Sequence, residues 1–250
     1  MTRLYCPVPV PLGQAFDLPA TAARHAQVLR LQPGDALDLF DGVGGAWTGQ
    51  VFAMGRQSVQ VRAEAPRTPS PRPARAITLA VGMPANERMD WLIEKATELG
   101  VSRVVPLLTQ RTVVRLSGDR AEKRLAHWRA IAAGACEQSG RDHLPQIDAV
   151  QTLAQWLTAS GHDGALGLRL RLSLAPGARS WTQVALAPDQ ALIAALGPEG
   201  GWSEDEERAL DRAGFAAVSL GSAVLRAETA ALTVLARWAD AGPSTSTPAQ

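Results

Sequence analysis

The fold is decided by the stretch Leu196-Gly-Pro-Glu-Gly-Gly-Trp-Ser-Glu-Asp-Glu206, in which a buried strand leads through a glycine-rich loop into a helix. The strand is the apolar run Ala191–Leu196, and Ser203 with Glu206 has the spacing of a capping box. Ligands of open α/β sheets bind beyond the carboxyl ends of strands, and glycine lets the backbone approach them closely. The stretch predicts an α/β domain with a ligand site at this loop, although an ordinary βα turn has the same pattern.

The charges beside this loop indicate what kind of ligand it takes. A phosphate cradle would carry a lysine followed by serine or threonine, which the loop lacks. Glu204, Asp205 and Glu206 follow the loop at the helix entry, where they suit the positive end of the helix dipole. A cationic or neutral ligand therefore fits better than a polyphosphate. S-adenosylmethionine, with a sulfonium and an amino group, is one such ligand, and a nucleotide-phosphate enzyme is the weaker alternative.

A second loop, Leu220-Gly-Ser-Ala-Val-Leu-Arg-Ala-Glu-Thr-Ala230, repeats this arrangement further along the chain. A short strand ends at its glycine, and a helix with a full apolar face is predicted over Ala227–Ala239. Arg226, Glu228 and Thr229 gather polar groups at the entry to that helix. Helix capping with a surface Arg–Glu pair would explain these residues equally well.

Strands and helices alternate throughout the segment that holds both loops. The expected strands are Ile77–Met83, Val101–Leu108, a weakly marked Ala165–Leu168, Ala191–Leu196 and Ala216–Leu220. The expected helices are Glu87–Leu99 with Gly100 as its cap, Arg120–Ser139, Ser203–Ala213 and Ala227–Ala239. This βαβ alternation predicts an α/β fold, a mostly parallel sheet with helices on both faces.

The segment that precedes this α/β part has the alternating apolar and polar pattern of short β-strands. Ala36–Phe40 alternates apolar and polar residues, DGVGG forms a hairpin-type turn over 41–45, and Ala46–Met54 continues the pattern. A further short strand is expected within Gly55–Glu64, and a helix over Ala20–Leu31. Several short strands with glycine turns predict a small β-barrel.

A proline-rich seam divides the two segments. Pro66–Arg75 holds four prolines in ten residues, which favour an extended linker over a packed core. We therefore predict one domain over residues 1–70, a second over 71–240, and a disordered tail over 241–250.

Composition excludes several classes of protein. The 250 residues are 46% hydrophobic and 20% charged, an ordinary balance for a globular chain. The two cysteines, Cys6 and Cys136, give neither a disulfide framework nor a metal-ligand spacing, so no metal is expected. No run is apolar enough for a membrane span and Met1–Pro11 is no signal peptide, so a cytoplasmic location is expected.

Basic residues suggest where RNA would bind. The net charge is only +1, but Met1–Arg75 carries eight arginines against five acids. The candidate RNA-binding residues are Arg24, His25, Arg30, Arg111 and Arg141. A solvated surface explains each of them equally well, and Arg141, after the expected cap Gly140, could instead meet a helix dipole.

Together these stretches resemble a known family, the RsmE-type 16S ribosomal RNA uridine-N3 methyltransferases of the SPOUT class. The specific match is GPEGGWSEDE followed by LGSAVLRAETAAL. RHAQVLRLQPGDALDLFDGVGG, ERMDWLIEKATELGVSRVVPLLTQRTVV and ACEQSGRDHLP agree in order, so the resemblance spans nearly the whole chain except the tail.

The resemblance implies a small PUA-like RNA-binding barrel, a methyltransferase domain with a deep trefoil knot, and a homodimer acting on 16S rRNA in the small ribosomal subunit. It implies S-adenosylmethionine as cofactor, bound by Leu196, Gly197, Glu199, Gly200, Gly201, Leu220, Gly221, Val224, Leu225, Thr229 and Ala230. Arg226 and Glu228 would be the catalytic residues beside the methyl group. Met83 and the end of the weak third strand would also line the pocket.

The chain departs from this family at one position. Members commonly read LGPRILR, whereas this chain has Ser222 and Ala223 before Val224, so the usual arginine is missing at Ala223. Arg226 is retained. The missing guanidinium favours the alternative of a non-catalytic RNA-binding protein that assists ribosome assembly and binds no cofactor.

The implied chemistry is methyl transfer to uracil N3, which carries a proton at neutral pH. A group must accept that proton, and Glu228 and Glu199 are the candidates. Arg226 would stabilise negative charge that develops on the uracil oxygens. A second enzyme hypothesis keeps the fold and changes the target to a ribose hydroxyl or a tRNA base.

Overall fold

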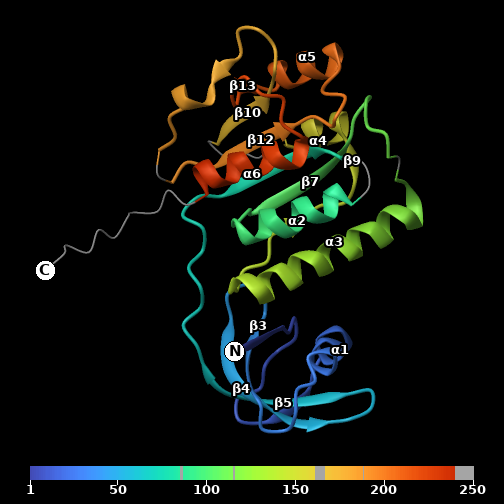
Figure 1. Cartoon of the computed structure of the whole chain (residues 1–250), viewed down its shortest axis with the longest axis vertical. Coiled ribbons are helices and arrows are strands. Elements are labelled where there is room, and N and C mark those ends of the chain that lie inside the picture. Colours follow the sequence, from blue (N-terminus) through green and yellow to red (C-terminus); the bar gives the residue numbers. More distant parts are fainter. Residues whose placement is uncertain (85–86, 115, 161–166, 188, 240–250) are drawn as a thin grey trace, which may run out of the picture. The chain divides into compact units, whose positions relative to one another are not determined.

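The computed structural model describes residues 1–84, 87–114, 116–160, 167–187 and 189–239. They form two compact units, which Figure 1 shows joined by more than one segment of chain. The first comprises Met1–Arg72 and Ala132–Leu144, and the second comprises Pro73–Ile131 and the residues from Pro145 onward. Nothing in the linker sequence signals that 132–144 joins the first unit. The tail predicted to be disordered, 241–250, lies outside the described residues.

The first unit is built on a five-stranded mixed sheet in the order β1-β3-β4-β5-β2, in which only β1 and β3 run parallel. Its elements are β1 (Thr2–Tyr5), β2 (Ala15–Asp17), α1 (Ala20–Val28), β3 (Ala36–Phe40), β4 (Ala46–Met54) and β5 (Val59–Pro66). The strands predicted over 36–40 and 46–54 have the predicted bounds. They do so because alternate residues of each strand, such as Leu37 and Val51, are buried in one apolar core with α1.

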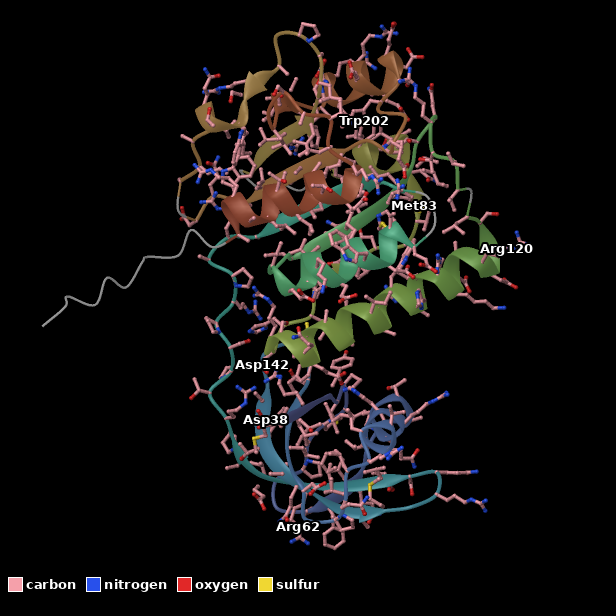
Figure 2. The ribbon with its side chains drawn as sticks, viewed as in Figure 1. Asp38, Arg62, Met83, Arg120, Asp142 and Trp202 are labelled. Carbon is pink, nitrogen blue, oxygen red and sulfur yellow. The ribbon has the colours of Figure 1, made fainter. Side chains whose placement is uncertain are left out.

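A buried ion cluster ties residues 132–144 to this sheet. Asp142 has a fully buried side chain and accepts hydrogen bonds from Arg3 at 2.7 Å, Arg67 at 2.6 Å and the Ser70 backbone at 2.6 Å. Asp38 on β3 lies 3.9 Å and 3.5 Å from the same two guanidiniums, and Figure 2 shows Asp38 and Asp142 close together. Four charges share one desolvated site, so the removal of any one leaves the others unbalanced.

The second unit is built on an eight-stranded parallel sheet in the order β11-β13-β10-β12-β6-β7-β8, with β9 also paired to β7. Its strands are β6 (Ile77–Gly82), β7 (Arg103–Leu108), β8 (Gln146–Ile147), β9 (Gln151–Thr152), β10 (Leu168–Leu172), β11 (Arg179–Ser180), β12 (Leu192–Leu196) and β13 (Ala216–Ser219). Its helices are α2 (Arg88–Glu98), α4 (Leu153–Ser160), α5 (Glu204–Arg212), α6 (Ala227–Trp238) and the 3-10 helix η1 (Trp181–Gln183), while α3 (Gly118–Ser139) runs from this unit into the first. The predicted parallel α/β sheet is confirmed.

Helices cover the sheet on both faces. α2 and α6 pack against each other over β6 and β12, as Figure 1 shows. On the opposite face, Leu153 and Trp156 of α4 and Leu210 of α5 bury a cluster with Ala80 and Ala195. α5 begins with the predicted capping box, since the Ser203 side chain and the Glu206 carboxylate each accept a hydrogen bond from the other's backbone N–H.

The weak third strand was predicted at the wrong place. The structure has β10 at Leu168–Leu172, which shares only Leu168 with the predicted Ala165–Leu168, and residues 165–166 lie outside the described part. The pattern LRLRL reads as a surface strand, but Arg171 is buried because Asp211 binds it at 2.7 Å and Glu207 lies 3.5 Å from it. Central strands of a parallel sheet usually appear in the sequence as continuous apolar runs. The arginines of LRLRL interrupt such a run, so the sequence did not indicate a buried strand here.

The buried ion cluster predicts the effect of Asp142→Asn on stability. Burial opposes ionisation of this carboxyl, but the hydrogen bond from Ser70 and the Arg3 guanidinium outweigh it and hold the pKa of Asp142 below its ordinary 3.8. We expect the substitution to lower the free energy of unfolding by about 3 kcal/mol at neutral pH, measured by chemical denaturation.

A carboxyl whose pKa is lower in the folded than in the unfolded state stabilises the protein at pH values above its unfolded-state pKa. This stabilisation is lost as the pH falls through its folded-state pKa. The difference in the free energy of unfolding between wild type and Asp142→Asn should therefore become smaller as the pH falls below 3.8. Glu204→Gln, at a side chain that is 88% exposed, is the control and should change stability by less than about 1 kcal/mol. Equal effects of the two substitutions would contradict a structural role for the cluster.

Candidate active site

A cavity of about 470 Å³ lies at the carboxyl ends of β10, β12 and β13. The sheet order places these strands side by side, and parallel strands end at the same edge, so the loops that follow them meet. The lining residues come from these three loops and the helix starts after them: Leu172–Ala175, Leu196–Trp202, Glu207, Val218, Leu220 and Ala223–Ala227 with Ala230. Both loops singled out in the sequence thus belong to one site.

Close backbone packing holds the loop after β12 against the end of β6. A Cβ on Gly82 would lie 2.5 Å from the Pro198 ring and 2.7 Å from its nitrogen, so only glycine fits at this point of β6. Gly201 has a positive φ of 68° and donates a backbone hydrogen bond to Pro198, which closes the turn. The shape of the loop therefore requires glycine at Gly82 and favours it at Gly201.

The structure gathers most of the predicted cofactor residues around the cavity. Those that line it are Leu196, Gly197, Glu199, Gly200, Gly201, Leu220, Val224, Leu225 and Ala230. Gly221 and Thr229 are exposed and are absent from the lining. Met83 is buried and absent from the lining as well, whereas the end of β10 does contribute, through Leu172 and Ser173.

Arg226 and Glu228 lie at the start of α6 in different environments. Arg226 is the exposed N-cap residue of the helix and lines the cavity. Glu228, in the first turn, is buried, and its Oε2 has no hydrogen-bond partner among the described residues. A buried carboxylate oxygen without a partner is costly, so it marks a place where a proton or a ligand group would be stabilising.

Arg88 is the site residue that the sequence analysis missed. It begins α2, and its Nη1 donates a hydrogen bond of 2.9 Å to Glu199 of the cavity loop, while its Nε lies 4.0 Å from Glu228 Oε1. No local sequence pattern marks Arg88, because its place in the site depends on the order of strands in the sheet. Arg88 follows β6, and β6 is the sheet neighbour of β12, so the segments after these two strands must come close.

The RNA-binding candidates fall in both units. In the first unit Arg24 and Arg30 are exposed at α1, and His25 Nδ1 lies 2.9 Å from Glu137. Arg30 has a positive φ of 56° just after α1, a conformation that usually belongs to glycine. Arg141 follows Gly140, which ends α3 with a φ of 81° as predicted.

Arg111, expected among the RNA contacts, lies at the cavity loop of the second unit. Its Nη1 donates a hydrogen bond of 2.8 Å to the carbonyl oxygen of Gly200. The neighbouring Gln110 backbone donates at 2.8 Å to Glu206, the capping residue of α5. Arg111 therefore supports the loop, and its contact with RNA stays a prediction.

Within the described residues, no group of three or more histidine, cysteine, aspartate or glutamate side chains is placed to hold a metal ion. The same part of the chain contains no helix with the length and apolar character needed to cross a membrane.

Comparison with known proteins decides the family. A family model described as an RNA methyltransferase domain matches residues 70–239, and one described as an RNA methyltransferase PUA domain matches residues 18–64. Curated relatives named ribosomal RNA small subunit methyltransferase E are 34% identical over 87% of this chain and 70% of the relative in Synechocystis, and 35% over 84% and 80% in Mycobacterium bovis. The chain belongs to the ribosomal RNA small subunit methyltransferase E family.

Solved structures of similar proteins match the fold over 95% of this chain. A ribosomal RNA small subunit methyltransferase E from Neisseria gonorrhoeae, bound to S-adenosyl methionine, has a TM-score of 0.85 with 34% identity and covers 95% of this chain and 96% of its own. A methyltransferase from Legionella pneumophila, in complex with the same cofactor, has a TM-score of 0.87 with 32% identity over the same shares. The predicted fold, a PUA-like domain followed by a SPOUT methyltransferase domain, is confirmed.

The contact between Gly82 and Pro198 predicts that Gly82→Ala distorts the cavity loop. Because the added methyl group meets backbone rather than a flexible side chain, we expect a loss of about 1–3 kcal/mol in the free energy of unfolding. Amide exchange at 197–202 should also become faster.

Gly134→Ala in α3 is the matched control, since a Cβ there meets nothing within 4 Å and alanine favours a helix. It should leave the loop unchanged and the protein at least as stable. An unperturbed loop in Gly82→Ala would refute the close-packing argument.

Proposed function

We propose that this protein methylates N3 of a uridine in bacterial 16S rRNA of the small ribosomal subunit, with S-adenosylmethionine as cofactor. The observation that carries the proposal is the single cavity formed by the GPEGG loop, the LGSAVLRAETA loop and the end of β10. Relatives of the same family and fold were crystallised with this cofactor.

The lining of the cavity suits this cofactor. Its volume of about 470 Å³ lies in the range of roughly 300–1,000 Å³ common for small-molecule sites. The carboxylates of Glu199 and Glu207 lie on the lining, where the guanidiniums of Arg88 and Arg171 offset their charge. Trp202, labelled in Figure 2, lines the cavity with a buried indole N–H that has no partner among the described residues and could donate to a ligand.

The backbone of 196–201 and 220–225 would hold the cofactor. When bound, it supplies a methyl group activated by its positive sulfur. The protein's own task is to orient the uracil and to accept the N3 proton. Glu228 is the better candidate base, since its Oε2 has no hydrogen-bond partner among the described residues, whereas Glu199 is bound to Arg88. Arg226 would stabilise the charge on the uracil oxygens.

The substrate must present an accessible N3. Pairing with adenine hides this atom, so the target uridine is unpaired or extruded from its stack when it reacts. Arg24, His25, Arg30 and Arg141 of the first unit and Arg111 of the second are the proposed contacts to the RNA backbone. Arg24, Arg30 and Arg111 are exposed, and because Arg111 already binds the Gly200 carbonyl oxygen, Arg24 and Arg30 suit phosphate contacts best.

The homodimer implied by the resemblance and the cytoplasmic location expected from the sequence are both part of the proposal. The large apolar side chains of Leu174 and Val224 are 64% and 78% exposed at the cavity, and a second copy would remove them from water. Sedimentation equilibrium tests the dimer. Val224→Glu should shift it toward monomer, and a wild-type monomer at micromolar concentration would refute it.

The acceptor in the RNA is tested by nucleoside mass spectrometry. Wild-type protein incubated with S-adenosylmethionine and small ribosomal subunits that lack the modification should yield N3-methyluridine. Disruption of the gene should remove that nucleoside from the small subunit. A methylated ribose, or product from tRNA alone, would favour the second enzyme hypothesis.

The replacement of the family arginine by Ala223 favours one other function, a non-catalytic assembly protein. Ala223 is exposed and lines the cavity, so the missing side chain would have stood at the site itself. This alternative predicts no heat of binding in a titration with S-adenosylmethionine, whereas the methyltransferase predicts saturable binding. Ala223→Arg should raise turnover if the missing guanidinium matters.

Substitutions at the start of α6 separate chemistry from binding. Glu228→Gln should lower turnover by about 10²-fold or more while cofactor affinity changes little, because a neutral amide cannot accept the proton. Arg226→Ala should lower turnover by about 10²-fold with little loss of stability. Single-turnover assays and calorimetric titration measure the two effects.

Arg237→Ala, at an exposed arginine in the last turn of the same helix, is the control and should leave turnover within about twofold of wild type. Full activity in Glu228→Gln would remove Glu228 as the base, and full activity in Arg226→Ala would remove Arg226 from the mechanism.

A further inference from the structure

We propose that Arg88 is a positioning residue that links the cofactor loop to the candidate base, by binding Glu199 and facing Glu228 with the same guanidinium. The inference rests on the proposed function for its activity measurements. Its structural part, the bracing of the loop by α2, holds for the protein without any ligand.

The contacts come from three different elements. Arg88 is the first residue of α2, Glu199 lies in the loop after β12, and Glu228 lies in the first turn of α6. Arg88 Nη1 is 2.9 Å from Glu199 Oε1, and Arg88 Nε is 4.0 Å from Glu228 Oε1. One side chain therefore joins a residue of the cavity wall to the buried carboxylate.

The two carboxylates need this cation to different extents. The Glu199 side chain is 32% exposed, so water screens its ion pair and the gain in energy is small. The Glu228 side chain is only 10% exposed, and a carboxylate removed from water needs an opposite charge or hydrogen bonds. The start of α6 supplies part of that stabilisation through the helix dipole, and Arg88 supplies a full charge.

A second arginine, Arg111, also braces the loop. Arg111 holds the carbonyl oxygen of Gly200 at 2.8 Å, so consecutive loop residues are tied to segments that follow β6 and β7. Within the described residues Arg111 makes no hydrogen bond or ion pair with Glu228, whereas Arg88 faces both carboxylates. A loss of Arg88 should therefore disturb the loop and the base together, and a loss of Arg111 the loop alone.

Arginine is required here because of its shape. A guanidinium presents donors on several edges and can face two carboxylates at once, while a lysine ammonium acts as a point charge on a flexible stem. Arg88→Lys should keep one ion pair and lose the other. Arg88→Lys should thus change either cofactor affinity or kcat while it leaves the other near the wild-type value. A general loss of folding would lower both quantities together.

The first test compares Arg88→Gln, Arg88→Lys and Arg124→Gln in the full chain. Arg124 is the matched control, since its side chain is 36% exposed against 39% for Arg88 and it pairs with Asp90 at 3.6 Å. Arg88→Gln should weaken S-adenosylmethionine binding by about threefold to tenfold and lower kcat by about tenfold or more. Arg88→Lys should stay within about threefold of wild type either in its affinity for the cofactor or in kcat, but not in both. Arg124→Gln should stay within about threefold of wild type in both quantities.

The second test is a double-mutant cycle with Glu228→Gln. If Arg88 acts on turnover through Glu228, Arg88→Gln should lower kcat by less than about twofold further in the Glu228→Gln background. A matching cycle with Glu199→Gln should show the same non-additivity in the dissociation constant. Additive effects in both cycles, or values for Arg88→Gln equal to those of Arg124→Gln, would overturn the proposal.

A third measurement needs no ligand. Amide hydrogen exchange at 199–202 in the cofactor-free protein should be faster in Arg88→Gln than in wild type and unchanged in Arg124→Gln. Unchanged exchange in Arg88→Gln contradicts the brace even if the enzyme is active. A wild-type protein that neither binds the cofactor nor methylates RNA would refute the proposed function, and the exchange experiment would still decide the role of Arg88.

Discussion

The parallel pairing of β13, β10, β12 and β6 is the constraint on which the rest of the second unit depends. Parallel strands end at one edge of a sheet, so this order brings three loops together that are distant along the chain. Gly82 lets the loop after β12 lie directly on the end of β6, at a distance that excludes any side chain. The cavity is therefore a consequence of strand order and backbone packing, and the charged side chains act on a framework already fixed.

Charged residues are used differently in the two units. In the first, Asp142 and Asp38 bind two arginines in a desolvated cluster that fixes residues 132–144 to the sheet. In the second, Arg88 and Arg111 hold the cavity loop at Glu199 and Gly200, and Glu228 is buried with one oxygen that has no hydrogen-bond partner among the described residues. Charge thus stabilises structure where opposite charges lie at hydrogen-bond distance, as around Asp142, and it is available for chemistry where a buried carboxylate such as Glu228 lies 4.0 Å from the guanidinium that faces it.

The sequence predicts those strands and helices whose bounds depend on local pattern. It does not predict elements and site residues that are determined by contacts with residues distant in the chain. Alternation in 36–40 and 46–54 and the Ser203–Glu206 box predicted strand and helix bounds closely, because propensity and burial agree there. β10 was predicted at the wrong place because Arg171 interrupts its apolar run. This arginine is buried in the strand only because Asp211 and Glu207 of α5, distant in the sequence, pair with it. α4 was missed although Leu153 and Trp156 have helical spacing, since eight residues give a weak signal. Both loops of the cavity were singled out in the sequence, and their binding of a cofactor stays a prediction. Arg88 was not predicted, because no local pattern records strand neighbours. The knot implied by the resemblance has no local signature either.

The most direct test of this account is a crystal structure of the protein with S-adenosylmethionine. We predict the cofactor in the cavity lined by 172–175, 196–202 and the segment 220–230, with its backbone contacts made by the two glycine-bearing loops. Glu228, which is not part of the lining, is predicted to come within reach of the acceptor side of the methyl group when the cofactor is bound. Density for the cofactor at another place, or an empty cavity at saturating cofactor in solution and in the crystal, would contradict it.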